Sequence, residues 1–286
     1  MSPPAATLDD AGLQFERQGP VAYLWLDRPA ARNALDGPLV AALTRWIMTL
    51  GEDAEVRVIV LGGRGPAFCA GADLAWMERL GTATMQENLA DALRLAELFR
   101  VLHECPRPTI ARVHGACYGG GIGLVAACDI ALANTGARFS LAEARLGVLP
   151  ATIGPHVLRA IGARASSRYM LTAEAFDGLE AVRLGLAHEA VDAPGLDVAV
   201  DRIVDALLAG GPQAQSGVKR LIRELAGRPL DDSLLHDTAR RIAEARASPE
   251  GREGLAAMLG KRRPDWSSRR ADPPTPRSAA RDESPP

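Results

Sequence analysis

Length, composition and charge place the chain among globular proteins and exclude wholly disordered ones. Its 286 residues suit one large domain or two small ones, and 47% of them are hydrophobic, which is enough for a sizeable core. Thirty-three basic and 35 acidic residues leave a net charge of −2, so no overall positive field holds the chain on nucleic acid or on an anionic membrane. We therefore expect neither a nucleic-acid partner nor a membrane.

Cysteine usage and the start of the sequence indicate a reducing compartment. The four cysteines form no C-x-x-C pair and lie in apolar surroundings, as reduced core thiols do. Residues 1–12 lack a basic segment followed by an apolar one, and no later stretch is apolar over the length of a bilayer. We expect a cytoplasmic protein without a disulfide framework.

The first part of the chain predicts a hairpin, a helix and a strand. Residues 13–26 have aromatic and branched side chains at strand spacing on both sides of a turn at Gly19. Asp36 is placed to cap a helix that ends before Gly51. The apolar run over residues 56–61 has the length of a buried strand.

The order of strand, loop and helix then repeats. An amphipathic helix is predicted over residues 85–103 and a buried strand over residues 109–113. A glycine turn at residues 119–123 opens a further helix, and residues 129–133 form the next strand. Strands separated by helices favour parallel pairing, so we expect an α/β protein.

The last third of the chain is predicted to be helical. From about Ile153 strand signals fade, except over residues 188–192, and helical spacing dominates. The proline-rich polar tail has too little apolar surface to offset the entropy of ordering it, so we expect disorder past Ser267. These patterns divide the chain into a core over 13–195, a helical region over 196–266 and a disordered tail over 267–286.

A run of glycines is a candidate anion site. Gly119, Gly120, Gly121 and Gly123 open a predicted helix, so several N–H groups without helical partners can point at one negative charge. Packing alone also explains the run, because glycines let a strand and a helix approach closely. Glycine in a helix costs about 1 kcal/mol per residue relative to alanine, which favours a reason beyond packing.

A second loop, over residues 67–73, also follows a buried strand and enters a helix. It offers a free N–H near Ala72, while Asp73 taken alone is explained as a helix cap. Two backbone N–H groups that converge on one carbonyl oxygen form an oxyanion hole. Losing one such donor costs about 3 kcal/mol of transition-state stabilisation.

A dinucleotide-binding fingerprint is the competing explanation of the glycines. Gly121, Gly123 and Ala126 have its spacing, and Glu143 follows about twenty residues later. In that fingerprint the acidic residue ends the next strand, whereas this strand is expected to end near Ala133. The helical last third supplies no second nucleotide-binding half. A nicotinamide enzyme is therefore the weaker alternative.

Four segments together resemble the enoyl-CoA hydratase/isomerase (crotonase) family in their order and approximate spacing. They are residues 26–35, 67–74, 107–133 and 139–162. The resemblance covers about residues 13–266. It implies an α/β fold, a crotonase-like spiral of ββα repeats with a C-terminal helical trimerisation region, and activity on acyl-CoA thioesters.

The resemblance also implies roles for particular residues. Ala72 and Gly120 match the two positions whose N–H groups bind the thioester oxygen, and Glu143 matches a general acid and base. Charge that moves onto the bound oxygen makes chemistry at the α and β carbons feasible at neutral pH. The positions matched to substrate binding, mainly of coenzyme A, are Arg28, Ala70, Asp73, Leu74, Gly119, Gly123 and Lys261, with Arg262 beside Lys261.

The chain departs from the family at Gly123, where typical hydratases have a second glutamate. Two such carboxylates hold water between them, and each contributes about 10²–10⁴-fold as acid or base. With glycine there, Glu143 either performs both proton transfers or catalyses a different reaction, such as moving a double bond from β,γ to α,β. A non-catalytic acyl-CoA or RNA binder is a further alternative, since the missing glutamate can mark lost activity.

Gly123 and residues 150–162 together resemble bacterial hydratases of the 3-methylglutaconyl-CoA and isohexenylglutaconyl-CoA type, which serve leucine and acyclic-terpene breakdown. Such substrates carry a second carboxylate, which favours a cation or a hydroxyl as its partner. Candidates near the motifs are His114, Tyr118, Arg145 and His156. We therefore expect a hydratase that adds water to a 2-enoyl-CoA of this type.

Neither a metal site nor a separate cofactor is expected. His103, His188 and His236 have no mate at metal-ligand spacing. Coenzyme A enters as part of the substrate. The expected partners are acyl-CoA and further copies of the chain, as a homotrimer or hexamer.

Overall fold

Two sheets organise the described part of the chain, residues 7–267 of a computed structural model. The larger sheet has seven strands in the order β1-β2-β3-β4-β6-β8-β11. These are Thr7–Leu8 (β1), Leu13–Gln18 (β2), Val21–Leu26 (β3), Val58–Gly63 (β4), Thr109–Val113 (β6), Ile130–Asn134 (β8) and Glu189–Val191 (β11). Strands β1 to β3 pair antiparallel, and β3, β4, β6, β8 and β11 pair parallel. The carboxyl ends of the parallel strands therefore lie at one edge.

A second sheet of four short strands has the order β10-β9-β7-β5. These are Phe176–Asp177 (β10), Arg138–Ser140 (β9), Ala116–Tyr118 (β7) and Ala67–Cys69 (β5). The sequence analysis missed this sheet, because strands of two or three residues are too short to show alternation.

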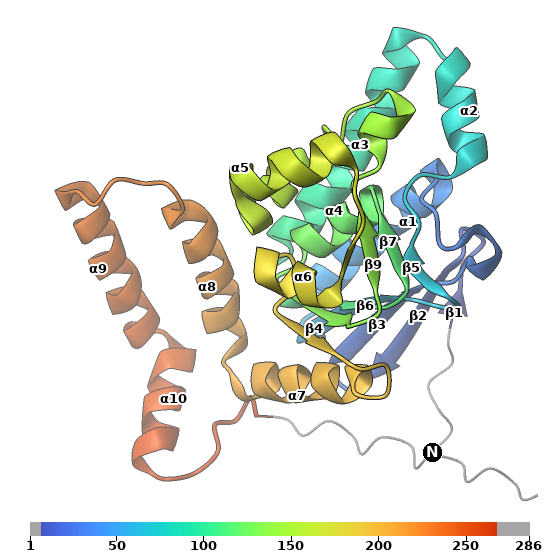
Figure 1. Cartoon of the computed structure of the whole chain (residues 1–286). Coiled ribbons are helices and arrows are strands. Elements are labelled where there is room, and N and C mark those ends of the chain that lie inside the picture. The colour runs from blue at the N-terminus through green and yellow to red at the C-terminus, as the bar shows by residue number, and fades with distance from the viewer. Residues whose placement is uncertain (1–6, 268–286) are drawn as a thin grey trace, which may run out of the picture.

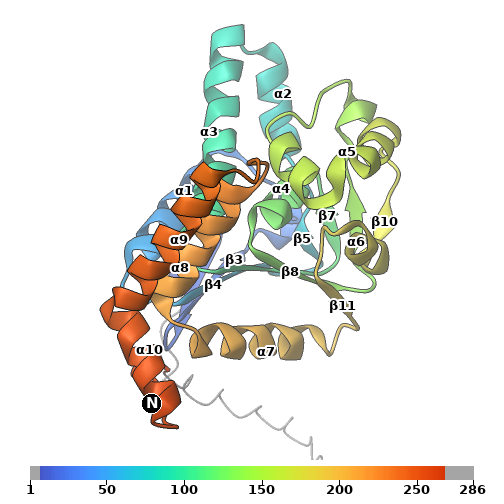
Figure 2. The same cartoon turned by 90° about the vertical axis from the view of Figure 1, so that its left-hand side faces the viewer.

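Helices fill the connections between strands. They are Gly37–Glu52 (α1), Leu74–Thr82 (α2), Met85–Glu104 (α3), Gly120–Ala127 (α4), Gly154–Thr172 (α5), Gly178–Leu184 (α6), Leu196–Ala209 (α7), Pro212–Leu225 (α8), Asp232–Ala247 (α9) and Pro249–Leu259 (α10), with 3₁₀ turns at Pro29–Ala31 (η1) and Glu143–Leu146 (η2). In both views α2 and α3 project beyond the sheets as a pair (Figures 1 and 2).

The chain builds this architecture by repeating a ββα unit. Strands β4, β6 and β8 belong to the large sheet, and the strands that follow them, β5, β7 and β9, belong to the small one. Each pair then leads into helical structure, namely α2 with α3, α4, and η2 with α5. Every second strand therefore ends where a helix begins, and the two glycine loops lie at such junctions.

Most elements predicted from the sequence are present. The hairpin of β2 and β3 is confirmed, and Asp36 caps α1 by accepting a hydrogen bond from the Leu39 N–H at 2.9 Å. The strand expected over 56–61 begins two residues later, as β4, because Val56 still belongs to the preceding turn and bonds to Asp53. Strand β10 interrupts the region where only one further strand was expected.

Two apolar clusters hold the sheets in place. The larger lies between the sheets and the helices around them, and it includes Phe68, Phe99 and Phe139. The smaller covers the other face of the large sheet and includes Val200 and Val204 of α7, a helix that contacts β4, β6, β8 and β11. Helix α7 is thus part of the sheet's packing.

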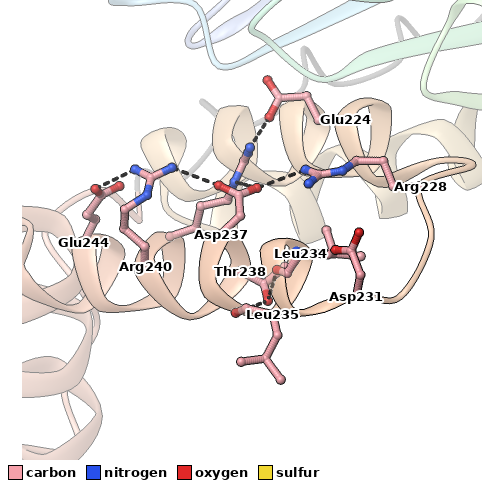
Figure 3. A network of polar contacts seen from close by, with 10 residues as sticks. Glu224, Arg228, Asp231, Leu234, Leu235, Asp237, Thr238, Arg240 and Glu244 are labelled. Carbon is pink, nitrogen blue, oxygen red and sulfur yellow. Dashed lines mark hydrogen bonds and ion pairs between the residues drawn. The ribbon is translucent and has the colours of Figure 1, made fainter.

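Helices α9 and α10 stand apart from the sheets (Figure 1). An ion pair joins α9 to α8, since Arg241 of α9 binds Glu224 of α8 at 2.5 Å. Asp237 of α9 also binds Arg228, in the connection between the two helices, at 3.3 Å (Figure 3). The C-terminal third is helical as predicted. The expected disorder past Ser267 concerns residues 268–286, which lie outside the described residues.

Among residues 7–267, no helix combines the length and the apolar character that a membrane crossing needs.

Candidate active site

In the loop between β5 and α2, the N–H of Ala72 points away from the neighbouring segment, which contains Leu35. Leu35 pairs with Ala72 in a parallel bridge, in which the Leu35 N–H donates to the Gly71 carbonyl at 2.7 Å and the Asp73 N–H donates to the Leu35 carbonyl at 2.8 Å. Successive N–H groups of extended backbone point to opposite sides. The Ala72 N–H therefore points away from Leu35, and within residues 7–267 it has no acceptor.

The loop between β7 and α4 presents a second free N–H, that of Gly120. Gly119 turns the chain with φ +47, a conformation that glycine adopts without strain, and its own N–H donates to the Ser140 carbonyl at 3.0 Å. Gly120 is the first residue of α4, so its N–H has no helical partner. In the described part of the chain it also has no other acceptor.

The two loops meet, and Glu143 lies where they meet. A methyl group added to Gly119 would lie 3.8 Å from the Cα of Gly71 and 3.0 Å from Oε1 of Glu143. The glycine before Ala72, the glycine before Gly120 and the Glu143 carboxylate are therefore neighbours. The structure thus brings the loops that carry the two unpaired N–H groups next to one carboxylate.

The Glu143 side chain is partly removed from solvent, and one of its carboxylate oxygens has no partner. It is the first residue of η2, and its Oε2 is buried without a hydrogen-bond partner among the described residues. Burial raises the pKa of Glu143. A carboxylic acid whose pKa moves toward neutrality is suited to take up a proton and release it again at neutral pH.

The space beside Gly123 is filled by apolar side chains. A methyl group added there would lie 2.3 Å from Cγ2 of Ile153 and 2.8 Å from the Phe99 ring. Gly123, Ile153 and Phe99 are all buried. No second carboxylate therefore replaces the missing glutamate at this position.

Proteins similar to this chain match it over most of its length. The family model described as enoyl-CoA hydratase/isomerase matches residues 16–269. The chain belongs to this family. The predicted fold, an α/β crotonase spiral with C-terminal helices, is confirmed.

Three relatives show how close the match is. An enoyl-CoA hydratase from Shewanella pealeana is 41% identical with a TM-score of 0.87, and the match covers 91% of this chain and 97% of that one. AtuE from Pseudomonas aeruginosa is 36% identical with a TM-score of 0.86, over 90% of this chain and 100% of that one. The 2,3-dehydroadipyl-CoA hydratase of Escherichia coli is 31% identical over 261 residues, which are 90% of this chain and 99% of the relative.

Several residues matched to substrate binding in the family have structural partners here. Arg28 binds Asp36 at 2.8 Å and Asp73 at 3.5 Å, and the Asp73 carboxylate caps α2 by accepting from Ala75 and Trp76. These contacts join the start of α1 to the start of α2. They explain Arg28 and Asp73 without a ligand.

Other matched residues differ in their access to the site. Leu74 is the first residue of α2 and is 84% exposed beside the Ala72 loop. The Ala70 N–H donates to the Arg32 carbonyl at 3.0 Å. Lys261 follows α10, which lies away from α2 and α4 in both views (Figures 1 and 2), so the structure does not bring it to the glycine loops. Its neighbour Arg262 binds Glu253 at 2.6 Å.

The four candidate partners of a second carboxylate lie in different places. The Nε2 of His114 lies 2.8 Å from the Gly65 carbonyl, in a pocket lined also by Trp25. His156 packs against Phe99, with ring centroids 6.0 Å apart. Tyr118 borders the site directly, since a methyl group on Gly71 would lie 3.9 Å from its Cβ. The fourth, Arg145, shares η2 with Glu143 and donates to the Thr172 carbonyl at 3.3 Å.

Sequence reasoning missed the residues that frame the loops. The backbone of Leu35 bonds to the residues on both sides of Ala72. Phe99 and Ile153 fill the space beside Gly123. Asn33 and Leu35 stand in a motif that carried the family resemblance, which was the only signal available for them. Phe99 and Ile153 are ordinary apolar residues of α3 and of the turn before α5, and no local pattern marks them.

The cysteines near the site are not suited to nucleophilic chemistry. Burial raises the pKa of Cys69 to about 12, so its thiol stays protonated at neutral pH. Its neighbour on β7, Cys117, is buried as well. Within the described residues no three His, Cys, Asp or Glu side chains are grouped to hold a metal ion.

Proposed function

We propose that this protein catalyses the reversible addition of water to the double bond of a 2-enoyl-CoA, with Ala72 and Gly120 binding the thioester oxygen and Glu143 transferring protons. The chain is an enoyl-CoA hydratase-type enzyme, a lyase that acts on enoyl-CoA, by its family and its relatives. The observation that carries our assignment of the site is the Glu143 carboxylate, with its buried and unpartnered Oε2, beside two free N–H groups.

A single carboxylate can perform both proton transfers of the hydration reaction. The oxygen of water bonds to the β carbon while Glu143 takes one of its protons, and the electrons of the double bond move through the α carbon onto the thioester oxygen. The Ala72 and Gly120 N–H groups stabilise this enolate charge. Protonated Glu143 then returns a proton to the α carbon. The apolar packing of Ile153 and Phe99 beside Gly123 supports this one-acid scheme, because it leaves no room for another carboxylate there.

Double-bond isomerisation is the second candidate, and the same packing favours it. One carboxylate suffices to remove a proton from the α carbon of a 3-enoyl-CoA and to return it at the γ carbon. Hydration remains our first proposal because relatives at about 30% identity over most of the chain are named as hydratases.

For the substrate we propose an acyl chain with a second carboxylate, of the methyl-branched glutaconyl type. The name of the E. coli relative, 2,3-dehydroadipyl-CoA hydratase, describes a dicarboxylic acyl chain and supports this class. Arg145 is exposed and forms no ion pair within residues 7–267, and Tyr118 borders the site. These two are the proposed partners of that carboxylate. His114 and His156 have their own contacts elsewhere.

We also propose that the chain self-associates through its C-terminal helices, as a homotrimer or hexamer. Several apolar side chains on α8 to α10 are exposed in the single chain. They are Val218, Ile222, Leu235, Ile242, Leu255, Met258 and Leu259. Contact with further copies would remove this apolar surface from water. Light scattering on the purified protein measures the assembly directly.

The test of the function compares three substrates and one variant. Purified protein is assayed on crotonyl-CoA, 3-methylglutaconyl-CoA and a 3-enoyl-CoA, and we expect hydration to be fastest on 3-methylglutaconyl-CoA. Glu143→Gln is expected to lower kcat about 10²–10⁴-fold. Glu55→Gln, an exposed glutamate on the turn before β4, is the matched control and should behave as wild type. Turnover confined to double-bond migration, or an active Glu143→Gln, contradicts the proposal.

A further inference from the structure

The segment Arg32–Leu35 touches both halves of the oxyanion site, and the proton chemistry makes no use of it. It lies between η1 and α1, and its residues carry part of the family motif. Both Arg32 and Asn33 have left-handed backbone, with φ of 50 and 58. Asparagine tolerates this conformation better than most residues. The segment is therefore held in one specific shape.

Asn33 fixes that shape with its side chain, which is fully buried. Its Oδ1 accepts from the Arg28 N–H at 2.8 Å. Its Nδ2 donates to the Arg64 carbonyl at 2.9 Å and to the Ala67 carbonyl at 2.7 Å. Ala67 is the first residue of β5, the strand that leads to Ala72. One amide therefore ties Arg32–Leu35 to the beginning of the oxyanion loop.

Backbone hydrogen bonds also hold the rest of the Ala72 loop against Arg32–Leu35. The Arg32 carbonyl accepts from Ala70, and Leu35 bonds to the residues on both sides of Ala72. These bonds pair the N–H groups of Leu35 and Asp73 and leave that of Ala72 without an acceptor among the described residues. A shift of Leu35 would therefore turn or displace that N–H.

The side chain of Leu35 reaches the other half of the hole. A methyl group added to Gly120 would lie 2.9 Å from Cδ1 of Leu35, and Leu35 is 1% exposed. Leu35 thus packs against the first turn of α4 while its backbone brackets Ala72. The two N–H donors come from different loops, and Leu35 is in contact with both loops.

We propose that Asn33 and Leu35 are positioning residues that set the separation of the Ala72 and Gly120 N–H groups. The inference rests on the proposed function, since it presupposes that these groups bind the thioester oxygen. Hydrogen bonds in a catalytic site depend steeply on placement, and a displacement of about 1 Å can lower a rate about 100-fold. Neither residue needs to touch the substrate to have this effect.

The test uses Leu35→Ala and Asn33→Asp. The first removes the contact with Gly120, and the second keeps the acceptor for Arg28 but loses both donated hydrogen bonds. We expect kcat on crotonyl-CoA to fall about 10–100-fold while KM changes less than about threefold. Leu35→Met, which refills the space, should restore most of the rate.

A spectroscopic measurement separates positioning from general loosening. Butyryl-CoA labelled with ¹³C at the thioester carbonyl binds without being hydrated, and the frequency of its carbonyl stretch falls as hydrogen bonds to the oxygen strengthen. On wild type we expect a band below that of the free ligand, and on Leu35→Ala and Asn33→Asp a band displaced back toward it.

Matched controls come from elsewhere in the fold. Leu43→Ala removes the same atoms from a fully buried leucine of α1, and Asn134→Asp changes an asparagine whose Oδ1 caps the turn after β8. Both should keep the wild-type kcat and carbonyl band when folded. If Asn33→Asp does not fold, Leu35→Ala and Leu35→Met decide the question alone, because they alter no hydrogen bond of Asn33.

The possible outcomes are distinct. Wild-type kcat and an unchanged carbonyl band in folded Leu35→Ala overturn the inference while leaving the proposed function standing. A wild-type band equal to that of the free ligand overturns the proposed function, and the inference with it. A displaced band with reduced kcat in the two variants, and in neither control, supports the inference.

Discussion

At the scale of single residues, Glu143 has opposite effects on activity and stability. Burial raises the pKa of Glu143. Hydration needs the carboxylate, so its rate should decline on acidification at a higher pH than it would with an ordinary glutamate, whose pKa is 4.5.

The raised pKa of Glu143 in the folded state also means that ionisation of this residue at neutral pH destabilises the fold, and this effect is absent below the pKa of the unfolded state. Glu143→Gln should therefore melt at a higher temperature than wild type at pH 8. Thermal unfolding measures this, and a lower Tm for the variant speaks against a buried carboxylate.

Gly123 gives a second prediction at this scale. Its replacement by alanine forces a methyl group against Ile153 and Phe99, and overpacking of this kind costs about 1–3 kcal/mol. Gly217→Ala in α8 is the matched control, because nothing lies within 4 Å of a methyl group there and alanine favours a helix interior by roughly 0.5–1 kcal/mol. Denaturant unfolding should show the two changes with opposite signs. A Gly123→Ala protein as stable as wild type contradicts the packing described.

At the scale of elements, an ion pair of the buried Lys219 joins α8 to Asp129, the residue before β8. The Nζ of Lys219, 8% exposed, lies 2.5 Å from Oδ2 of Asp129 and 2.9 Å from the Arg107 carbonyl. Lys219→Met leaves Asp129 without its cation and should lower stability by about 3 kcal/mol, the low end for a buried pair because Asp129 is partly exposed. Lys261→Met, at the exposed other lysine, should change stability by less than about 0.5 kcal/mol in the same denaturant titration. Equal effects of the two variants would contradict this attachment.

The contact between α3 and α5 should make stability depend on pH. Burial lowers the pKa of His103 from 6.5 to about 4, and Arg159 donates to its Nε2 at 3.0 Å. Because the unfolded chain takes up a proton near pH 6.5 and the folded chain only near pH 4, stability falls as pH decreases between these values. His103→Gln should reduce the loss between pH 7 and pH 5 by about 1 kcal/mol, half the full linkage value because the contact is partly solvent-screened. An unchanged pH dependence in the variant would exclude His103 as its source.

The elements also show what the sequence can and cannot predict. The hairpin of β2 and β3 and the capped helix α1 were predicted because their signals are local. The four short strands of the second sheet depend on neighbours distant in the chain and leave no local pattern. The free N–H groups of Ala72 and Gly120 were predicted through glycine loops and a motif. The packing around Gly123, which decides how many carboxylates the site holds, required the tertiary structure.

At the scale of the whole molecule, the repeat of ββα units explains why the site lies where it does. Each unit passes from the large sheet to the small one before its helix begins, so β5 and β7 end side by side and their following loops converge. Helices α9 and α10 lie on another side of the molecule (Figure 1). The proposed catalytic site and the proposed self-association surface therefore lie on separate parts of the chain.

A crystal structure with a bound 3-hydroxyacyl-CoA tests the central claim most directly. We predict the thioester oxygen about 2.7–3.1 Å from both the Ala72 and the Gly120 nitrogen, with the Glu143 carboxylate in hydrogen-bond contact with the 3-hydroxyl group. A thioester oxygen held by other groups, or a ligand whose hydroxyl lies beyond the reach of Glu143, would contradict the account.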